Sequence, residues 1–101
     1  PMNYNFMQKL QKLRTEIGKP FFINSGYRCD EYEALIGGTG KNHPTGKACD
    51  IYADNTTLCL IVGLAKQFGF TGVGIKMNGE HEERFVHLDT THETFTVWTY
   101  K

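Results

Sequence analysis

Two histidines and one aspartate have the residue types and the spacing of a metal site. His43 lies in a segment that contains glycine and proline, Asp50 follows it by seven residues, and His87 lies far down the chain. Two imidazoles and one carboxylate suffice to bind a catalytic zinc, which takes three protein ligands and leaves a fourth position for water. Zinc would lower the pKa of that water and polarise a substrate carbonyl. A single histidine is usually an ordinary surface residue, so the prediction of a zinc site depends on the three residues together.

The elements that carry these residues must hold them in a fixed geometry. Residues 47–53 are predicted to form a strand, in which Asp50 and its neighbour Cys49 point to opposite faces. His43 lies in the irregular loop before that strand, and His87 lies in the middle of a later one. The three candidate ligands therefore come from separate elements.

Apolar residues at helical spacing predict two main helices. The first covers residues 4–17 and is ended by Gly18, because glycine favours the left-handed conformation of a helix C-cap. The second is capped by Asn55 or Thr56 and runs to about Phe68.

Runs of β-forming residues between turn signals predict a sheet. Asn78-Gly79 is a tight-turn signal between two of its strands. The predicted strands cover residues 21–24, 47–53, 70–77, 84–89 and 94–100. A short helix could also form at residues 30–36. With two main helices packed on a mostly antiparallel central sheet, the predicted fold class is α+β.

The composition indicates one small domain over residues 1–101. Hydrophobic residues make up 40% of the chain and aromatic residues 13%, which is enough for a folded core. The 11 basic and 11 acidic residues are spread along the chain, which argues against a nucleic-acid binder. The longest apolar run is too short to span a bilayer, and no basic amphipathic helix suggests a membrane surface. We expect no signal peptide in this chain, and a monomer or a domain of a larger protein.

The three cysteines do not form a recognisable disulfide framework. Cys29, Cys49 and Cys59 are odd in number and irregular in spacing, so we expect small buried thiols. Cysteine usage therefore leaves the cellular compartment undecided.

Over nearly its whole length the chain resembles the M15 family of zinc D,D-carboxypeptidases and related peptidoglycan peptidases, and its short carboxypeptidase-like branch above all. The motifs that carry the resemblance are Ser25-Gly26-Tyr27-Arg28, His43-Pro44-Thr45-Gly46-Lys47-Ala48-Cys49-Asp50 and Phe85-Val86-His87-Leu88-Asp89. The resemblance implies a Hedgehog/DD-peptidase-like fold and a Zn²⁺ ion bound by His43, Asp50 and His87. It also implies a peptidoglycan stem peptide as the substrate and the bacterial cell wall as the place of action.

The same resemblance implies roles for residues near the metal. Arg28 would bind the substrate carbonyl or carboxylate and stabilise the developing oxyanion, since a guanidinium stays charged and can bind two oxygens at once. Ser25 and Tyr27 are candidates for substrate binding, although Ser-Gly is also an ordinary turn. Tyr52 and Trp98 could line a substrate groove, although aromatic residues are more often part of a core.

The chain departs from the family pattern at the general base. Arg84 stands where many members have a carboxylate, and Phe85 where others have a histidine. Asp89 is the best substitute, because it shares a strand face with His87. It could take a proton from water or only orient His87. Glu83 is an alternative if a bulge redirects it, but the acidic segment before Arg84 is more simply a solvated loop.

Two functions therefore stay open. One is an active zinc peptidase, either a D,D-carboxypeptidase or an endopeptidase, in which a zinc-bound water attacks a carbonyl polarised by zinc and Arg28. The other is a catalytically inactive, zinc-containing module that binds cell wall or belongs to a virion. The two remaining histidines, His81 and His92, are expected to be exposed in loops.

Overall fold

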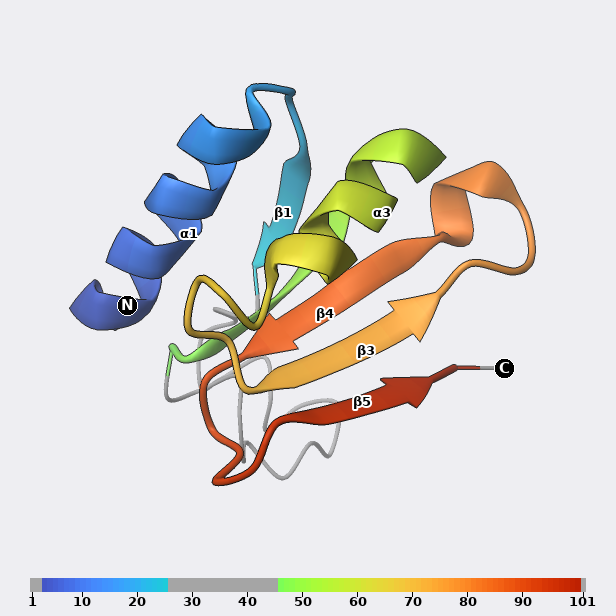
Figure 1. The fold of residues 1–101 in the computed structure, drawn as a ribbon. Coiled ribbons are helices and arrows are strands. Elements are labelled where there is room, and N and C mark those ends of the chain that lie inside the picture. Colours follow the sequence, from blue (N-terminus) through green and yellow to red (C-terminus); the bar gives the residue numbers. More distant parts are fainter. Residues whose placement is uncertain (1–2, 26–45, 101) are drawn as a thin grey trace, which may run out of the picture.

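The computed structural model describes residues 3–25 and 46–100, which form a five-stranded sheet with helices against one of its faces (Figure 1). The helices are α1 (Tyr4–Ile17), α3 (Asn55–Leu64) and a 3₁₀ helix, η2 (His81–Glu83). The strands are β1 (Phe22–Ser25), β2 (Ala48–Tyr52), β3 (Gly72–Lys76), β4 (Phe85–Asp89) and β5 (Thr96–Thr99). They are ordered β1-β2-β4-β3-β5, and every neighbouring pair is antiparallel except β3 with β5. The predicted α+β class with a mostly antiparallel sheet is confirmed.

Helix α1 forms where its apolar periodicity predicts it. The side chain of Asn3 caps the first turn by accepting a hydrogen bond from the Phe6 amide at 3.1 Å. Gly18 ends the helix in the left-handed conformation, with φ 67°. Phe6, Leu10 and Leu13 form the buried stripe that packs on the sheet.

Helix α3 has a different cap from the predicted one. The cap is Asp54, whose carboxylate accepts a hydrogen bond from the Thr57 amide at 2.7 Å, and neither Asn55 nor Thr56 takes that position. The hydrogen bond from Thr57 lowers the pKa of the Asp54 carboxyl. The prediction missed by one residue because Asp, Asn and Thr are all good caps and stand in succession here.

The end of α3 also differs from the prediction. The helix proper stops at Leu64, and turns continue to Gly69. There the Phe70 amide donates to the carbonyl of Ala65 at 3.0 Å, a bond of the Schellman motif, and Gly69 adopts φ 93°. The glycine thus closes the helical segment as a glycine C-cap does, although the regular α-helix ends earlier.

The connection from β3 to β4 is longer than the predicted tight turn. Gly79 has φ 84°, as a turn glycine should, but η2 follows it before β4 begins. The helix predicted at 30–36 and most of the loop that carries His43 lie outside the described residues.

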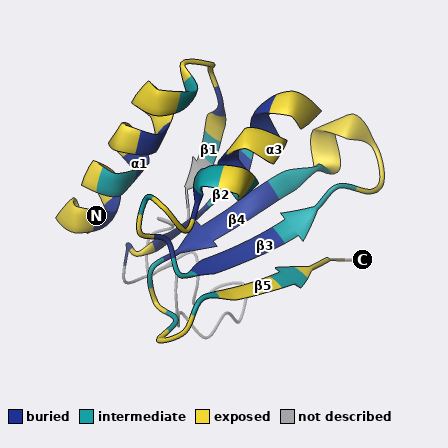
Figure 2. Cartoon of the chain, in the orientation of Figure 1, coloured by how far each residue is buried: buried dark blue, intermediate teal, exposed yellow. Residues whose placement is uncertain are grey.

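The helices and the sheet share one apolar core. Alternate residues of the central strands face α1 and α3, where Leu58 and Ile61 meet them (Figure 2). Phe6 and Phe70 meet edge to face there, with ring centroids 5.6 Å apart. The strand residues in this core are Cys49, Ile51, Val73, Val86 and Leu88. The residues that alternate with them lie on the other face of the sheet and include Asp50, His87 and Asp89 as well as the aromatic Tyr52 and Phe85.

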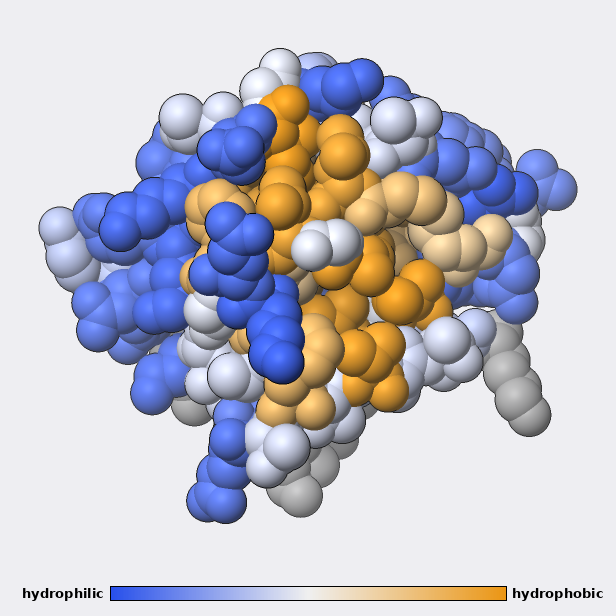
Figure 3. All heavy atoms as spheres, in the orientation of Figure 1, coloured by the Kyte–Doolittle hydropathy of each residue, from blue (hydrophilic) through white to orange (hydrophobic). Residues whose placement is uncertain are grey.

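The surface on the helix side is apolar around α3. Figure 3 shows hydrophobic side chains gathered over α3 and the strands beside it, flanked by the hydrophilic residues of α1. Cys59 is exposed on α3, so the expectation of a buried thiol is wrong there, whereas Cys49 is buried as expected. Burial raises the pKa of the Cys49 thiol, with a further contribution from the charge of Asp50. Within the described ranges, no helix is long and apolar enough to cross a membrane.

Candidate metal and peptidase site

The sheet register brings Asp50 and His87 together on the face opposite the helices. The two residues are partners in the antiparallel pairing of β2 with β4. Their side chains meet across the strands, with Nδ1 of His87 3.0 Å from Oδ1 of Asp50. Their chain neighbours Cys49 and Leu88 point into the core, as the alternation of a strand requires. Two of the three predicted ligands are therefore in contact.

Asp89 holds the other side of the His87 ring. Its Oδ2 lies 2.8 Å from Nε2 of His87, as expected for residues that share a strand face. Its second oxygen, Oδ1, accepts hydrogen bonds from the amide and hydroxyl of Thr91, both at 3.1 Å, and from Nδ1 of His92 at 2.8 Å. The side chain is fully buried. Burial alone would raise the pKa of Asp89, but the hydrogen bonds from His87 and His92 outweigh it and lower that pKa.

The two carboxylates determine the charge of His87. The ring is buried, with 5% of its side chain exposed, which by itself would lower its pKa. Hydrogen bonds to Asp50 and Asp89, together with their charges, outweigh burial and raise the pKa of His87 to about 9. Since each ring nitrogen faces a carboxylate oxygen, both nitrogens donate in the metal-free chain and the ring is an imidazolium at neutral pH.

Two glycines in β3 make room for this cluster. Gly72 pairs with Asp89 and Gly74 with His87. A Cβ atom on Gly72 would lie 2.4 Å from both carboxylate oxygens of Asp89, and one on Gly74 would lie 2.6 Å from Nε1 of Trp98. Glycine in a strand often marks such a close approach, so two glycines spaced by two in a strand are a signal of this cluster in the sequence.

His92 belongs to the cluster: it lies in a loop, as expected, but it is only partly exposed. It bonds Asp89, 32% of its side chain is exposed, and its ring lies 5.3 Å from that of Trp98. Trp98 also lies 5.4 Å from the ring of His87, because β5 runs beside Gly74. His81 is exposed on η2, as expected. The bond from His92 to Asp89 is local, three residues apart, whereas its contacts with Thr71 and Trp98 depend on the pairing of the strands.

The remaining predicted site residues are placed only in part. Tyr27, Arg28 and His43 lie outside the described residues. Ser25 is the last residue of β1, where its backbone pairs with Cys49 of the neighbouring strand. Its role in substrate binding stays a prediction.

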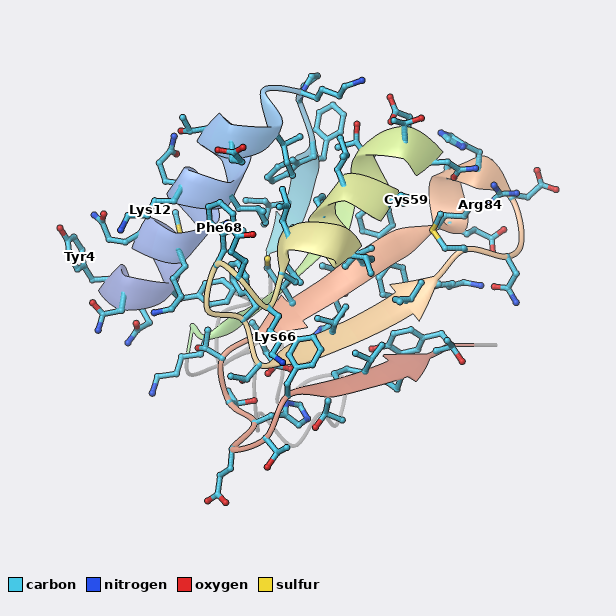
Figure 4. The ribbon with its side chains drawn as sticks, in the orientation of Figure 1. Tyr4, Lys12, Cys59, Lys66, Phe68 and Arg84 are labelled. Atoms are coloured by element: carbon cyan, nitrogen blue, oxygen red, sulfur yellow. The ribbon has the colours of Figure 1, made fainter. Side chains whose placement is uncertain are left out.

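Arg84 makes structural hydrogen bonds, whereas the acidic segment before it is exposed. The Arg84 guanidinium donates to the carbonyl of Gly79 at 3.1 Å and to Oδ1 of Asn55 at 3.4 Å. Figure 4 shows Arg84 beside η2, at the start of β4. Glu83 and the other residues of η2 are exposed, as expected of a solvated segment.

The described donors fit part of a zinc site. Asp50 and His87 offer an oxygen and a ring nitrogen that already converge, and Asp89 fixes the orientation of the ring. Among the residues that the structure describes, no group of three or more His, Cys, Asp and Glu side chains is arranged to hold a metal ion. A third ligand would have to come from His43, outside the described ranges.

Comparison with known proteins agrees with the fold and with these motifs. A family model described as Peptidase M15 matches residues 1–89, which include Asp50, His87 and Asp89. No curated protein matches the chain. The M15 family is generally one of zinc peptidases, and it implies the Hedgehog/DD-peptidase fold. Since the match covers most of its length, the chain belongs to the M15 peptidase family.

Proposed function

We propose that the chain is a zinc-dependent peptidase that hydrolyses peptide bonds in the stem peptides of peptidoglycan. The observation that carries the proposal is the contact between Asp50 and His87 on the face of the sheet opposite the helices, in a chain of the M15 family. His43, Asp50 and His87 would hold the metal. Zinc, when bound, supplies a positive charge that polarises a carbonyl and lowers the pKa of water. The place of action would be the bacterial cell wall.

The chain's own residues would prepare the site for the metal. Asp89 accepts a hydrogen bond from Nε2 of His87, which leaves Nδ1 on the side of Asp50. Nδ1 of His87 and the carboxylate of Asp50 would be the atoms that hold the metal. Nδ1 would have to be deprotonated to serve as a ligand.

Substrate binding would fall to residues around this centre. Arg28 would bind a carbonyl or carboxylate of the stem peptide, since its planar guanidinium can contact two oxygens. Ser25 and Tyr27 would line the same region. Tyr52 and Trp98 lie on strands of the site-bearing sheet and offer partly exposed aromatic surface. Whether the cut bond is terminal, as in a D,D-carboxypeptidase, or internal is decided by which substrate is turned over.

The contacts of Asp89 favour orientation of His87 over transfer of a proton. Its carboxylate is fully buried and both oxygens accept hydrogen bonds. Its lowered pKa makes it a weak proton acceptor at neutral pH.

The substitution Asp89→Asn distinguishes the two roles. If Asp89 acts as the base, Asp89→Asn will keep zinc and lose turnover. If it orients the ligand, Asp89→Asn will lose zinc affinity as well. Glu83→Gln should leave both unchanged.

The second candidate is an inactive, zinc-containing module that binds cell wall or belongs to a virion. Arg84 favours it, because its guanidinium is committed to Gly79 and Asn55 at the position where many relatives carry a carboxylate. Such a protein would keep Asp50 and His87 for binding and stability without turnover.

Metal content and turnover together test the proposal. The purified chain should contain one zinc, which His87→Ala should lose while His81→Ala keeps it. A D,D-carboxypeptidase would release D-alanine from a pentapeptide stem, whereas an endopeptidase would solubilise intact peptidoglycan. Zinc with neither activity would favour the inactive module, and a chain without zinc would contradict both.

A further inference from the structure

We propose that His92 is a positioning residue of the metal site, acting through Asp89 to fix the ring of His87; this inference rests on the proposed function. The role concerns orientation of a ligand and involves no contact of His92 with the ion. The family pattern that led to His43, Asp50 and His87 does not include position 92.

A continuous chain of hydrogen bonds links His92, Asp89 and His87. Nδ1 of His92 bonds Oδ1 of Asp89 at 2.8 Å, and Oδ2 of the same carboxylate bonds Nε2 of His87 at 2.8 Å. Because one carboxylate is shared, the position of His92 limits its rotation. A carboxylate that cannot rotate holds the plane of the His87 ring, and with it the direction of Nδ1.

The surroundings of His92 hold it in that position. Its amide donates to the hydroxyl of Thr71 at 3.1 Å, which ties the segment after β4 to the segment before β3. The ring of Trp98 packs against the rings of His92 and His87, with centroid distances of 5.3 and 5.4 Å. The carboxylate of Asp89 lies in the space that a Cβ atom on Gly72 would occupy. A histidine that only covered the surface would not need a ring nitrogen directed at a buried carboxylate.

Two substitutions distinguish the contribution of the Nδ1 hydrogen bond of His92 from that of its aromatic ring. His92→Phe keeps an aromatic ring against Trp98 but removes the donor to Asp89. His92→Asn keeps a donor near the place of Nδ1 but removes the ring. His81→Phe, on the exposed η2, is the matched control.

The first readout is zinc affinity of the full chain, measured by competition with a chelator. We expect His92→Phe to weaken binding by up to roughly 10-fold, the lower end of the effect of losing a direct partner of a metal ligand, because His92 acts on His87 only through Asp89. His92→Asn should retain most of the affinity, and His81→Phe should equal the wild type. Equal affinity of wild type and His92→Phe would overturn the inference, and so would an equal loss in His92→Phe and His92→Asn.

The second readout needs no metal. In the zinc-free chain the Nε2 proton of His87, held by Asp89, should give a slowly exchanging imidazole signal in NMR. We expect the signal to broaden in His92→Phe and to persist in His92→Asn and in His81→Phe. Should the wild type bind no zinc, the proposed function fails, while an unchanged signal in His92→Phe contradicts the positioning role alone.

Discussion

Gly72 gives the carboxylate of Asp89 its place in the sheet. A Cβ at position 72 would lie 2.4 Å from both oxygens, and these oxygens already bond His87 and His92. Gly72→Ala must therefore displace the carboxylate and weaken those bonds. We expect a loss of roughly 1 to 3 kcal/mol in the free energy of unfolding, measured by urea denaturation of the zinc-free chain.

Gly63 is the control for that substitution. It lies within α3, and a Cβ there would meet nothing within 4 Å. Gly63→Ala should stabilise the chain by roughly 0.5 to 1 kcal/mol, because alanine is the better helix former. A destabilisation of the same size in both variants would mean that the close approach to Asp89 is not the cause.

Residue types and spacing, together with the resemblance to the M15 family, predicted Asp50 and His87 as ligands of one ion, and the two side chains do meet. The same signals could not identify His92 or Trp98. His92 bonds Asp89, three residues earlier, but nothing in the motif indicates that its ring turns back to that carboxylate. The contacts of Trp98 depend on β5 lying parallel to β3, which places Trp98 beside Gly74. Such pairing is a property of the whole sheet and leaves no local pattern.

At the scale of elements, α1 was predictable to the residue because its apolar spacing and its glycine end agree. The start of α3 was not, because Asp54, Asn55 and Thr56 are all good caps.

Asp54→Ala should lower the unfolding midpoint of the chain, since the first turn loses the acceptor for the Thr57 amide. Thr56→Ala should leave the midpoint unchanged or raise it slightly. Equal midpoints for the two variants would contradict the assignment of the cap.

For the molecule as a whole, the raised pKa of His87 determines how the free energy of unfolding of the zinc-free chain depends on pH. Its folded pKa, about 9, lies above the value of about 6.5 expected in the unfolded chain. The stabilisation from its ion pairs is fully present below about pH 6.5 and is lost as the pH rises through about 9. Asp89 has a lowered pKa, so its contribution is present above about pH 4 and is lost as the pH falls further. Stability of the zinc-free chain should therefore be greatest between about pH 4 and about pH 6.5.

Zinc should reverse the alkaline part of this profile. The ion competes with the Nδ1 proton of His87, so its affinity rises with pH over the range in which the zinc-free chain loses stability. Unfolding followed from pH 6 to pH 9 should show a loss on the order of 3 kcal/mol without zinc. It should show a smaller loss, or a gain, with zinc in excess. In His87→Gln, which has no group to titrate there, the zinc-free profile should be flat over this range. A wild-type profile as flat as that of His87→Gln would mean that Asp50 and Asp89 do not hold a proton on the ring, and that the ligand side chains are free before the metal arrives.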